Sequence, residues 1–447
     1  MAGRVPTAPP RGMRDILPDE VELRDAAVRE IVAVYRAYGF RRIETPALES
    51  LRLLAGSDGG ENEKLIFKVM KRGEELEAAR RAGEDLADLG LRFDLTVPLA
   101  RYYAENHARL PDPLKAIQIG PVWRAERPQK GRFRQFTQCD IDVLGLASPL
   151  VEIELILATT DALARLGLSG LTVRINDRRL LELVARHCGF PEAAQAAFFI
   201  AFDKLDRLGA AGVLAELREG GHDADAVRRF EALLPELSAA EVSLEGLRAA
   251  LPGSAEAAWE SLATIIATAN AEIAAGCRVR FDPTLVRGMG YYTGPIFEIA
   301  APGYASSIAG GGRYDRMIGR LLGREVPASG FSIGFERLIS ILAERGGMPA
   351  REGAAAPQRR VALLVDDGGD VAAAVRAAKA LRVEGDLVSL EVRRKNVKKQ
   401  LDDLVTHGFW GYATLDDATR RPTPKALARR EEPRHPQGGH PQRGPSK

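Results

Sequence analysis

Apolar and polar residues alternate along two neighbouring stretches of the chain, 117–126 and 132–143. Successive side chains of a β-strand point to opposite faces, so this alternation predicts two strands. The segment 127–131 between them, RPQKG, has the proline and glycine of a turn, and we therefore expect a hairpin. Odd-numbered positions such as Ile117 and Ile141 are mostly apolar and form one face of this hairpin.

The opposite face of the hairpin is polar and carries a single aromatic ring. Its members are Gln118, Arg124, Glu126, Arg132, Arg134, Phe136, Gln138, Asp140 and Asp142. The polar face of a strand most often meets solvent. Here, however, Phe136 stands among charges, as a platform for a stacked base would, and the arginines lie nearer the turn than the two aspartates. Arginine matches phosphate and aspartate matches ammonium or imidazolium, so we expect a ligand with an anionic and a cationic end.

The remaining pattern mixes helices and strands. Helical spacing predicts an amphipathic helix over 18–39 and an all-helical insertion over 190–275, where alanine, leucine and glutamate dominate. This composition suits a spacer and a binding module equally well. Strand-type sequence returns over 277–300, and the segments 304–323 and 327–347 each predict a strand, a glycine turn and a helix.

The C-terminal part of the chain is organised differently. The segment 346–358 lacks periodicity and is expected to be a linker after a first domain, 1–345. Strand and helix patterns alternate over 359–418, which predicts a small α/β domain with a parallel sheet. From residue 359 onward, 18 Lys and Arg stand against 12 Asp and Glu. The last stretch, 419–447, has six prolines and little to bury, so we expect a disordered basic tail.

Composition narrows the class of protein. At 447 residues, with 45% hydrophobic and 28% charged residues, the chain should form two or three globular domains. Three widely spaced cysteines, Cys139, Cys188 and Cys277, disfavour a zinc site or a disulfide framework and indicate a reducing compartment. The chain has no 18-residue apolar run and no apolar signal segment, so we expect a cytoplasmic protein with no membrane association. Its net charge of +2 limits any nucleic-acid site to a local patch, and without a glycine-rich phosphate loop a nucleotide must be held by side chains.

Several segments resemble the motifs of one enzyme family. IETPALES, with Pro46, is similar to motif 1 of the class II aminoacyl-tRNA synthetases, the stretch 124–136 to their motif 2, and GFSIGFERL, with Arg337, to their motif 3. LVRGMGYYTGPIFE and SSIAGGGRYDRMIG resemble signature segments of the histidyl-tRNA synthetases, as do RGMRDILP and RFDLTVPLARY. The resemblance covers residues 10–415, and its motifs in this order are highly specific together.

The resemblance implies roles for residues along the predicted site. Histidine would be bound by Asp94, Leu95, Thr96, Arg124, Gln138, Asp142, Arg287, Tyr291 and Tyr292. ATP would be bound by Arg124, Glu126, Arg132, Phe136 and Arg337. Arg124 and Arg287 are implied to be catalytic, since they would approach the reacting carboxylate and α-phosphate from opposite sides.

The resemblance also implies the fold, the reaction and the partners. The fold would be α+β, a class II catalytic domain with an antiparallel sheet, the helical insertion, and a C-terminal α/β domain that corresponds to the anticodon-binding domain. The reaction would be ATP-dependent ligation of L-histidine to tRNA(His) through a histidyl-adenylate. ATP would come with Mg²⁺, with no prosthetic group and no metal-binding residues of the chain itself. A homodimer through the motif 1 region is also implied.

Two features depart from the family pattern. An aspartate often stands in the family at the position of Gly290, so this chain lacks a carboxylate there. After WGYATLDDATRRP the sequence shows no further strand and helix of the kind that closes the family's last domain, which would weaken anticodon contacts.

Two other functions are compatible with the same core. One is a non-catalytic paralogue, the regulatory subunit of the ATP phosphoribosyltransferase of histidine biosynthesis, and the other is an amino-acid ligase that acts without tRNA. The paralogue lacks the last domain and tends to lose the catalytic arginines. Because this chain has Arg124, Arg287 and Arg337 and a domain after the core, its sequence favours the synthetase.

Overall fold

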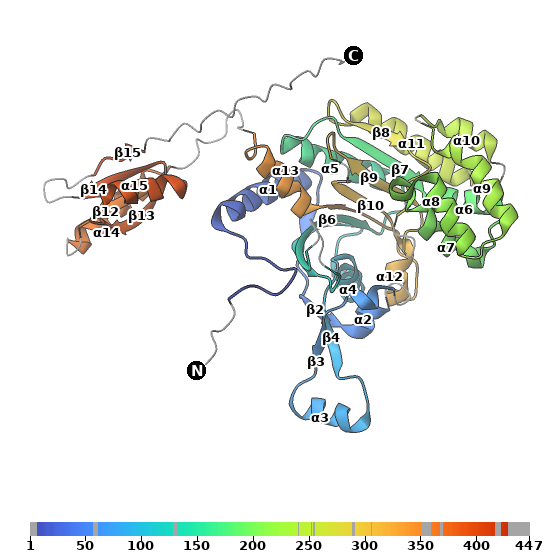
Figure 1. Cartoon of the computed structure of the whole chain (residues 1–447), viewed down its shortest axis with the longest axis horizontal. Helices are drawn as coiled ribbons and strands as arrows, with labels where there is room; N and C mark the ends of the chain where they lie inside the picture. Colours follow the sequence, from blue (N-terminus) through green and yellow to red (C-terminus); the bar gives the residue numbers. More distant parts are fainter. Residues whose placement is uncertain are drawn as a thin grey trace, which may run out of the picture. The chain divides into compact units, whose positions relative to one another are not determined.

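The protein is described here by a computed structural model of its chain. It covers residues 7–56, 61–127, 133–239, 241–251, 253, 255–287, 291–304, 306–349, 359–366, 370–415 and 422–427. The chain divides into two compact units, Met1–Pro349 and Ala350–Lys447 (Figure 1). The boundary between them falls within the segment 346–358 that was expected to be a linker.

An eight-stranded sheet forms the centre of the first unit. In spatial order its strands are β1 (Arg41–Arg42), β5 (Leu114–Trp123), β6 (Gln135–Leu144), β11 (Ala328–Ile333), β10 (Ala309–Arg313), β9 (Pro295–Ala300), β7 (Thr172–Asp177) and β8 (Arg278–Phe281). Among these described strands, only the outer pairs β1–β5 and β7–β8 are parallel. The antiparallel class II architecture expected from the resemblance is thereby confirmed.

The predicted hairpin is the pair β5–β6, and its two faces differ as the alternation indicated. Cys139, Ile141 and Val143 are fully buried in the main core, where α1 (Pro18–Ala37), α5 (Pro149–Arg165) and α13 (Phe335–Glu344) cover this face of the sheet. The alternate residues of β6 point to the opposite face, where Leu144 packs under α4 (Thr96–Asn106) and α12 (Asp315–Leu322). Gln138, Asp140 and Asp142 lie beyond these helices and line a cavity, so this part of the polar face is available to a ligand.

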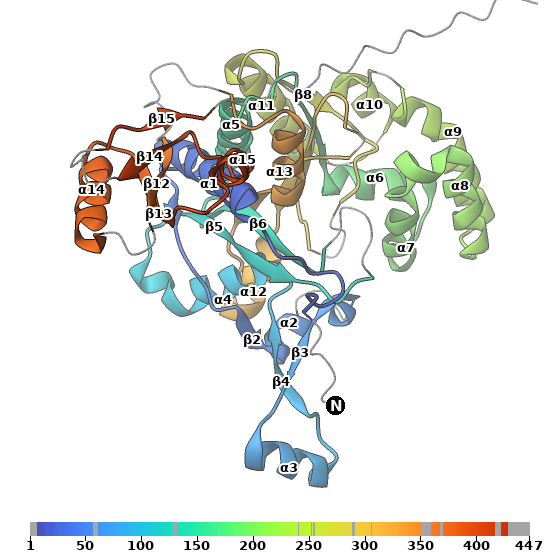
Figure 2. The ribbon, with the colours of Figure 1, turned by 60° about the vertical axis from the view of Figure 1, so that its left-hand side comes forward.

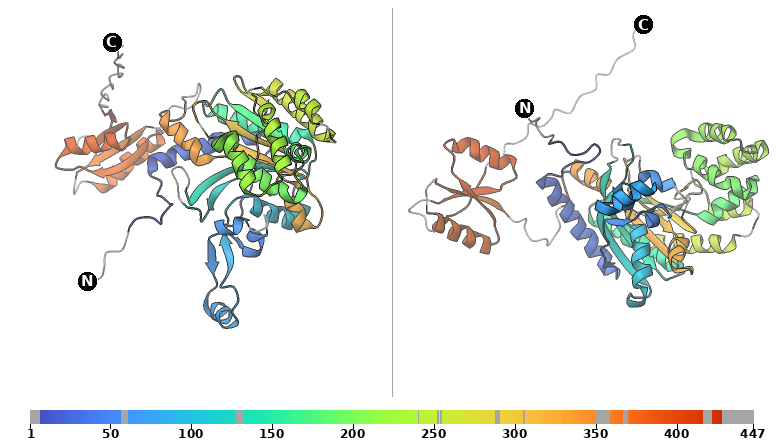
Figure 3. Two further views of the ribbon diagram at one scale, coloured as in Figure 1. Left: turned by 45° about the vertical axis from the view of Figure 1, so that its right-hand side comes forward. Right: turned by 90° about the horizontal axis from the view of Figure 1, so that it is seen from below.

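The segment expected as an all-helical insertion consists of helices in the structure. They are α7 (Glu192–Phe202), α8 (Leu205–Glu219), α9 (Ala224–Leu237), α10 (Leu244–Ala250) and α11 (Glu256–Glu272), and α6 (Arg178–Cys188) leads into them. Phe198, Phe202 and Phe230 pack against one another in the middle of this group, with ring centroids 4.9 to 5.7 Å apart. Figure 3 shows that these helices gather at the β7–β8 end of the sheet.

A smaller sheet lies at the other end of the first unit. It pairs β2 (Leu48–Ser50), β4 (Ala87–Leu91) and β3 (Lys68–Met70), and α3 (Gly73–Ala82) connects the last two strands at the tip of a projecting hairpin (Figure 2). Between this small sheet and the main one lie α2 (Leu51–Ala55), α4 (Thr96–Asn106) and α12 (Asp315–Leu322). The small sheet thus begins within the motif 1 segment, whose last three residues form β2.

The second unit is a small α/β domain. β13 (Leu387–Val392), β12 (Arg360–Val365) and β14 (Gly411–Leu415) are parallel, with α14 (Val371–Val383) and α15 (Val397–Thr406) as the crossover helices. A fourth strand, β15 (Lys425–Ala426), pairs antiparallel with β14.

The strand β15 corrects two sequence expectations. It lies beyond Leu415, where no further strand was expected, and inside 419–447, which was expected to be a disordered tail. Leu427 also donates its backbone N–H to Trp410 and packs beside Leu364 and Leu404. A two-residue strand that follows Pro422 and Pro424 has no periodic signal, which explains why the pattern of the sequence missed it.

Candidate active site

The polar face of the main sheet forms the floor of a cavity of about 740 Å³. Strand pairing places one row of residues side by side across it. From β5 to β7 this row is Gln118, Asp140, Ser332, Gly310, Glu298 and Arg174. All of these except Gln118 line the cavity, so residues distant in sequence meet on one surface.

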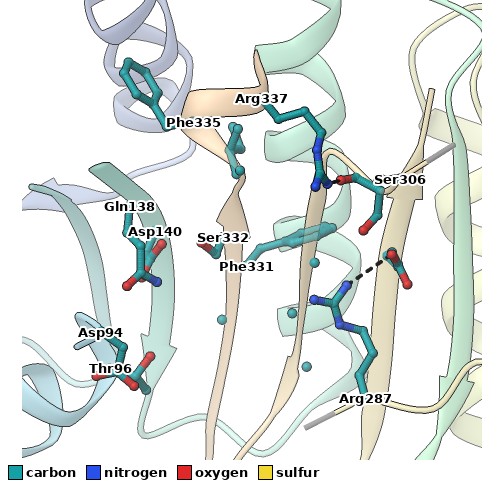
Figure 4. Close-up of a pocket in the computed structure, with 18 of the residues that line it drawn as sticks. Asp94, Thr96, Gln138, Asp140, Arg287, Ser306, Phe331, Ser332, Phe335 and Arg337 are labelled. Carbon is teal, nitrogen blue, oxygen red and sulfur yellow. Dashed lines mark hydrogen bonds and ion pairs between the residues drawn. The ribbon is translucent and has the colours of Figure 1, made fainter. Parts of the chain in front are cut away.

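One side of the cavity is acidic and buried. Asp140 and Asp142 on β6 are each only 4% exposed, and Asp94, Thr96 and Gln138 line the same side (Figure 4). Burial raises the pKa of Asp142 to about 7, and the negative charge of Asp94 adds to this, against a hydrogen bond from Tyr314. Burial, followed by the charge of Asp142, also raises the pKa of Asp140 well above its ordinary value. A cationic ligand would relieve the repulsion among these carboxylates.

Two buried acceptors on this side lack a hydrogen-bond partner within the described part of the chain. They are Oε1 of Gln138 and Oδ1 of Asp140. The amide of Gln138 donates to the other oxygen of Asp140 at 3.3 Å, which orients both side chains. Buried polar atoms are usually satisfied, so this pair of oxygens indicates a ligand that brings hydrogen-bond donors.

Three tyrosines stand near the aspartates. The rings of Tyr291 and Tyr292 lie 4.3 Å apart, and both line the cavity. Tyr314 is buried and donates its hydroxyl to Oδ1 of Asp142 at 2.5 Å. Burial raises the pKa of all three phenols, so they remain neutral donors at physiological pH.

Arginines occupy other walls of the cavity. The Nε of Arg124 donates to the carbonyl of Phe93 at 3.0 Å, and the guanidinium lies 5.0 Å from the centroid of the Phe136 ring. Arg287 faces Glu298, with Nη1 3.4 Å from Oε1. Arg337 donates to the carbonyl of Ser307. Figure 4 shows Arg287 and Arg337 on the side opposite Gln138 and Asp140, so the cavity has one acidic and one cationic side.

Glycines make room for these side chains. A Cβ on Gly330 would overlap the carboxylate of Asp142, to which Gly330 is paired across the sheet. A Cβ on Gly310 would overlap the guanidinium of Arg287. Gly310 of SSIAGGG and Gly330 of PASGF lie within strands β10 and β11, so the glycine turn expected over 304–323 is part of a strand here, and the missing side chains leave room for the site.

The structure brings together most of the residues that the sequence implied. The residues that line the cavity as expected are Asp94, Thr96, Arg124, Glu126, Phe136, Gln138, Asp142, Arg287, Tyr291, Tyr292 and Arg337. Leu95 differs from them, because its side chain is 1% exposed and does not line the cavity, while its carbonyl accepts from Gln118. Arg132 and Gly290 lie outside the described residues.

Several lining residues were not assigned a role from the sequence. Asp140 shares the polar parity of Gln138 and Asp142, a signal that could have identified it. Glu298 and Tyr314 carry no comparable signal, because they reach the site only through the order of the strands.

Two sequence comparisons relate the chain to one family of known proteins. Residues 12–338 match the family model described as Histidyl-tRNA synthetase. The chain is 47% identical over 424 residues to the histidine–tRNA ligase of Leifsonia xyli subsp. xyli, which covers 93% of this chain and 96% of that protein.

Solved structures of similar fold agree with the sequence relatives. The histidyl-tRNA synthetase of Nostoc sp. PCC 7120 superposes with a TM-score of 0.76 at 27% identity and covers 95% of each chain. An ATP phosphoribosyltransferase regulatory subunit/histidyl-tRNA synthetase of Bacillus halodurans C superposes with a TM-score of 0.72 over 91% of this chain and 97% of that one. Its identity is 21%, so this second likeness concerns the fold alone.

Proposed function

The chain belongs to the histidyl-tRNA synthetase family, and we propose that it ligates L-histidine to tRNA(His) in two steps. In the first step a carboxylate oxygen of histidine attacks the α-phosphorus of ATP, the bond to pyrophosphate breaks, and histidyl-adenylate forms. In the second step a ribose hydroxyl at the 3′ end of the tRNA attacks the carbonyl carbon, and AMP leaves.

The observation that carries this proposal is the two-sided cavity. Its acidic side holds the unpartnered oxygens of Gln138 and Asp140, and its other side holds Arg287 and Arg337. An amino acid joined to a nucleotide phosphate has the matching charges, a cationic amino end and an anionic phosphate end. Few other small ligands combine both with a base for Phe136 to stack on.

We assign the acidic side to histidine. Asp94, Thr96 and Gln138 would hold the ammonium group, which donates hydrogen bonds that fit their oxygens. Asp142 and the tyrosine pair would hold the imidazole, because an acid and a phenol can bond to both ring nitrogens. A site built around buried polar atoms rejects amino acids that cannot pair with them.

We assign the reacting centre to Arg124 and Arg287. Bringing a carboxylate to an anionic phosphate is opposed by charge, and fixed positive charge on both sides lowers that barrier. Arginine suits this role because it stays protonated. The bond from Arg124 to the Phe93 carbonyl and the ion pair of Arg287 with Glu298 support this assignment, since they hold both guanidinium groups in place.

The nucleotide would lie between motif 2 and motif 3. Phe136 would stack on the adenine, Glu126 and Arg132 would hold the nucleotide, and Arg337 would meet the γ-phosphate. Among the described residues, no three His, Cys, Asp or Glu side chains form a cluster that could hold a metal ion. Mg²⁺ would accordingly arrive with ATP, bound mainly by phosphates and water, and Glu126 is a carboxylate of the cavity that could join them.

The second unit would bind the anticodon region of the tRNA. Five exposed basic residues lie at and after the C-terminal end of β13, and they are Arg393, Arg394, Lys395, Lys398 and Lys399. Clustered positive charge of this kind binds a phosphate backbone. The histidine–tRNA ligase relatives match this unit as well as the first, which disfavours the regulatory paralogue.

A homodimer in the cytoplasm completes the proposal. β1 is the outermost strand of the main sheet, and in the adjoining small sheet Leu48 and Leu89 remain 43% and 38% exposed, as a surface for a second copy would be. The cysteines Cys139, Cys188 and Cys277 are free, which fits a reducing compartment. No helix in the described ranges is long and apolar enough to cross a membrane.

ATP–pyrophosphate exchange measured with each of the twenty amino acids tests the proposal. Exchange with histidine alone, followed by charging of tRNA(His), is the expected result. Exchange with histidine but no charging would favour the tRNA-independent ligase, and no exchange with any amino acid would favour the regulatory paralogue.

A further inference from the structure

Arg92 is a buried arginine outside the cavity, and its side chain contacts two parts of the first unit. It is 7% exposed. Its Nη1 donates to the carbonyls of Thr45 at 2.7 Å and Pro46 at 3.3 Å, and its Nε donates to the carbonyl of Pro121 at 3.0 Å. The guanidinium thereby joins the motif 1 segment to strand β5. Burying a charge costs free energy even when backbone carbonyls accept hydrogen bonds from it, so we expect Arg92 to serve a function.

Three backbone carbonyls of the segment 92–95 accept hydrogen bonds from β5 or from Arg124, which directly follows β5. The carbonyl of Arg92 accepts from the N–H of Trp123 at 3.0 Å, and the carbonyl of Leu95 accepts from Nε2 of Gln118 at 3.0 Å. Between them, the carbonyl of Phe93 accepts from Nε of Arg124 at 3.0 Å. The position of this segment therefore decides where the guanidinium of Arg124 lies.

The same segment supplies one wall of the cavity. Asp94 and Thr96 line the acidic side, and Oδ1 of Asp94 accepts from the N–H of Val97 at 3.1 Å at the start of α4. A contact that fixes this segment therefore fixes both Arg124 and Asp94. These two residues would lie on either side of the carboxylate of histidine that reacts.

We infer that Arg92 is a positioning residue for the activation step. Its guanidinium fixes the segment 92–96 against motif 1 and β5, and so holds Arg124 and Asp94 at the spacing that histidine needs. This inference rests on the proposed function, because it names the substrate whose binding should change. Arg92 itself does not line the cavity and touches no reacting atom.

Two substitutions disturb the hydrogen bonds of the Arg92 guanidinium in different ways. In Arg92→Met the apolar stem remains and the hydrogen bonds are lost. In Gly120→Ala the guanidinium remains but is displaced, since a Cβ on Gly120 would lie 2.8 Å from Nη2 of Arg92. Arg92→Lys keeps the charge but has a single donor nitrogen, which cannot span Thr45 and Pro121 at once.

Arg101→Met is a matched control. Arg101 on α4 pairs with the buried Glu49 of β2, with Nε 2.9 Å from Oε1, so its loss also weakens the link to motif 1. Arg101 does not line the cavity, and within the described residues its side chain donates to Glu49 and not to the segment 92–95.

The experiment measures exchange kinetics and thermal melting of the full-length variants. We expect Arg92→Met to lower kcat/KM for histidine by roughly ten- to a hundredfold, as displacement of a reacting group does. The KM for ATP should change less, because Glu126, Phe136 and Arg337 would also hold the nucleotide. Gly120→Ala should act in the same direction, the double variant should be no worse than Arg92→Met, and Arg92→Lys should not restore the rate. Arg101→Met should melt at a lower temperature yet keep wild-type kcat/KM.

Other results would distinguish a wrong inference about Arg92 from a wrong proposed function. Equal losses in Arg92→Met and Arg101→Met, or a fall in kcat for Arg92→Met and Gly120→Ala that matches a fall in the number of active sites titrated by the burst of adenylate, would mean a role in folding alone and would overturn the inference. If Arg92→Met does not fold, Gly120→Ala and Arg92→Lys decide by the same criteria. Absence of exchange in the wild-type protein would instead refute the proposed function.

Discussion

Tyr314 donates its phenolic hydrogen to Asp142 from a strand that is not adjacent to that of the aspartate. Tyr314 directly follows β10, Asp142 belongs to β6, and β11 lies between the two strands. Gly330 on β11 stands opposite Asp142 and has no side chain to block the approach. The pocket proposed for the imidazole thus has a carboxylate that is oriented before any ligand binds.

Asp142 should make the stability of the protein depend on pH. Its folded pKa of about 7 lies above the ordinary 3.8, so between these values the unfolded chain loses the proton first. Stability should therefore fall as pH rises through this window and stay low above it. Asp142→Asn cannot lose a proton and should melt at a higher temperature than the wild-type protein at pH 8. Its free energy of unfolding should exceed that of the wild type by at most about 4 kcal/mol at this pH, and the difference should vanish towards pH 4. Thermal melts of both proteins at pH 4 and pH 8 check this, and an equal difference at the two pH values would contradict it.

Asp142 should also govern the affinity for histidine. In Asp142→Ala the imidazole loses its acceptor, so the KM for histidine should rise far more than the KM for ATP. Exchange kinetics with each substrate varied in turn give both constants. A similar rise in both would place the imidazole pocket elsewhere.

Arg287 should act on the chemical step. Arg287→Ala is expected to cost roughly 2.7–4 kcal/mol, or about 10²–10³ in kcat for exchange, as the loss of one preorganised donor does. Gly310→Ala should reduce the rate in the same direction, because its Cβ would displace the guanidinium. Circular dichroism should show an intact fold in both variants. Near-normal exchange in Arg287→Ala would remove this residue from the mechanism.

The oligomeric state can be measured directly. A homodimer should sediment at about twice the 48.5 kDa of one chain at micromolar protein. Leu48→Asp and Leu89→Asp would place charges on the exposed face of the small sheet, so each should weaken the dimer. A single-chain mass for the wild-type protein would exclude the dimer.

Two truncations test the end of the second unit. A chain ending at residue 427 keeps β15 and should exchange ATP and pyrophosphate normally, with at most a modest loss in charging that shrinks as salt rises. A chain ending at residue 421 loses β15 and the contacts of Leu427, so the second unit should become sensitive to protease. Exchange should persist in both, because the lining residues all precede residue 338. Equal protease sensitivity of the two chains would mean that β15 does not stabilise the unit.

Periodicity in the sequence was sufficient to predict much of the site. Alternation over 132–143 predicted that Gln138, Asp140 and Asp142 share a face, and the structure confirms it. This works because the two-residue period of a strand depends only on local backbone geometry. The helices of the insertion follow from local spacing for the same reason.

Contacts between distant segments were decided only by the tertiary structure. Glu298 beside Arg287, Tyr314 on Asp142 and Arg92 on Pro46 depend on the order of strands and on close backbone approach, and no local period encodes either. The direction of the Leu95 side chain could not be predicted either, because residues of a loop do not alternate regularly between two faces. In the folded protein this side chain is buried in the core. The sequence alone determined which residue types face together along each strand, whereas the pairing of the strands decided which of those residues meet.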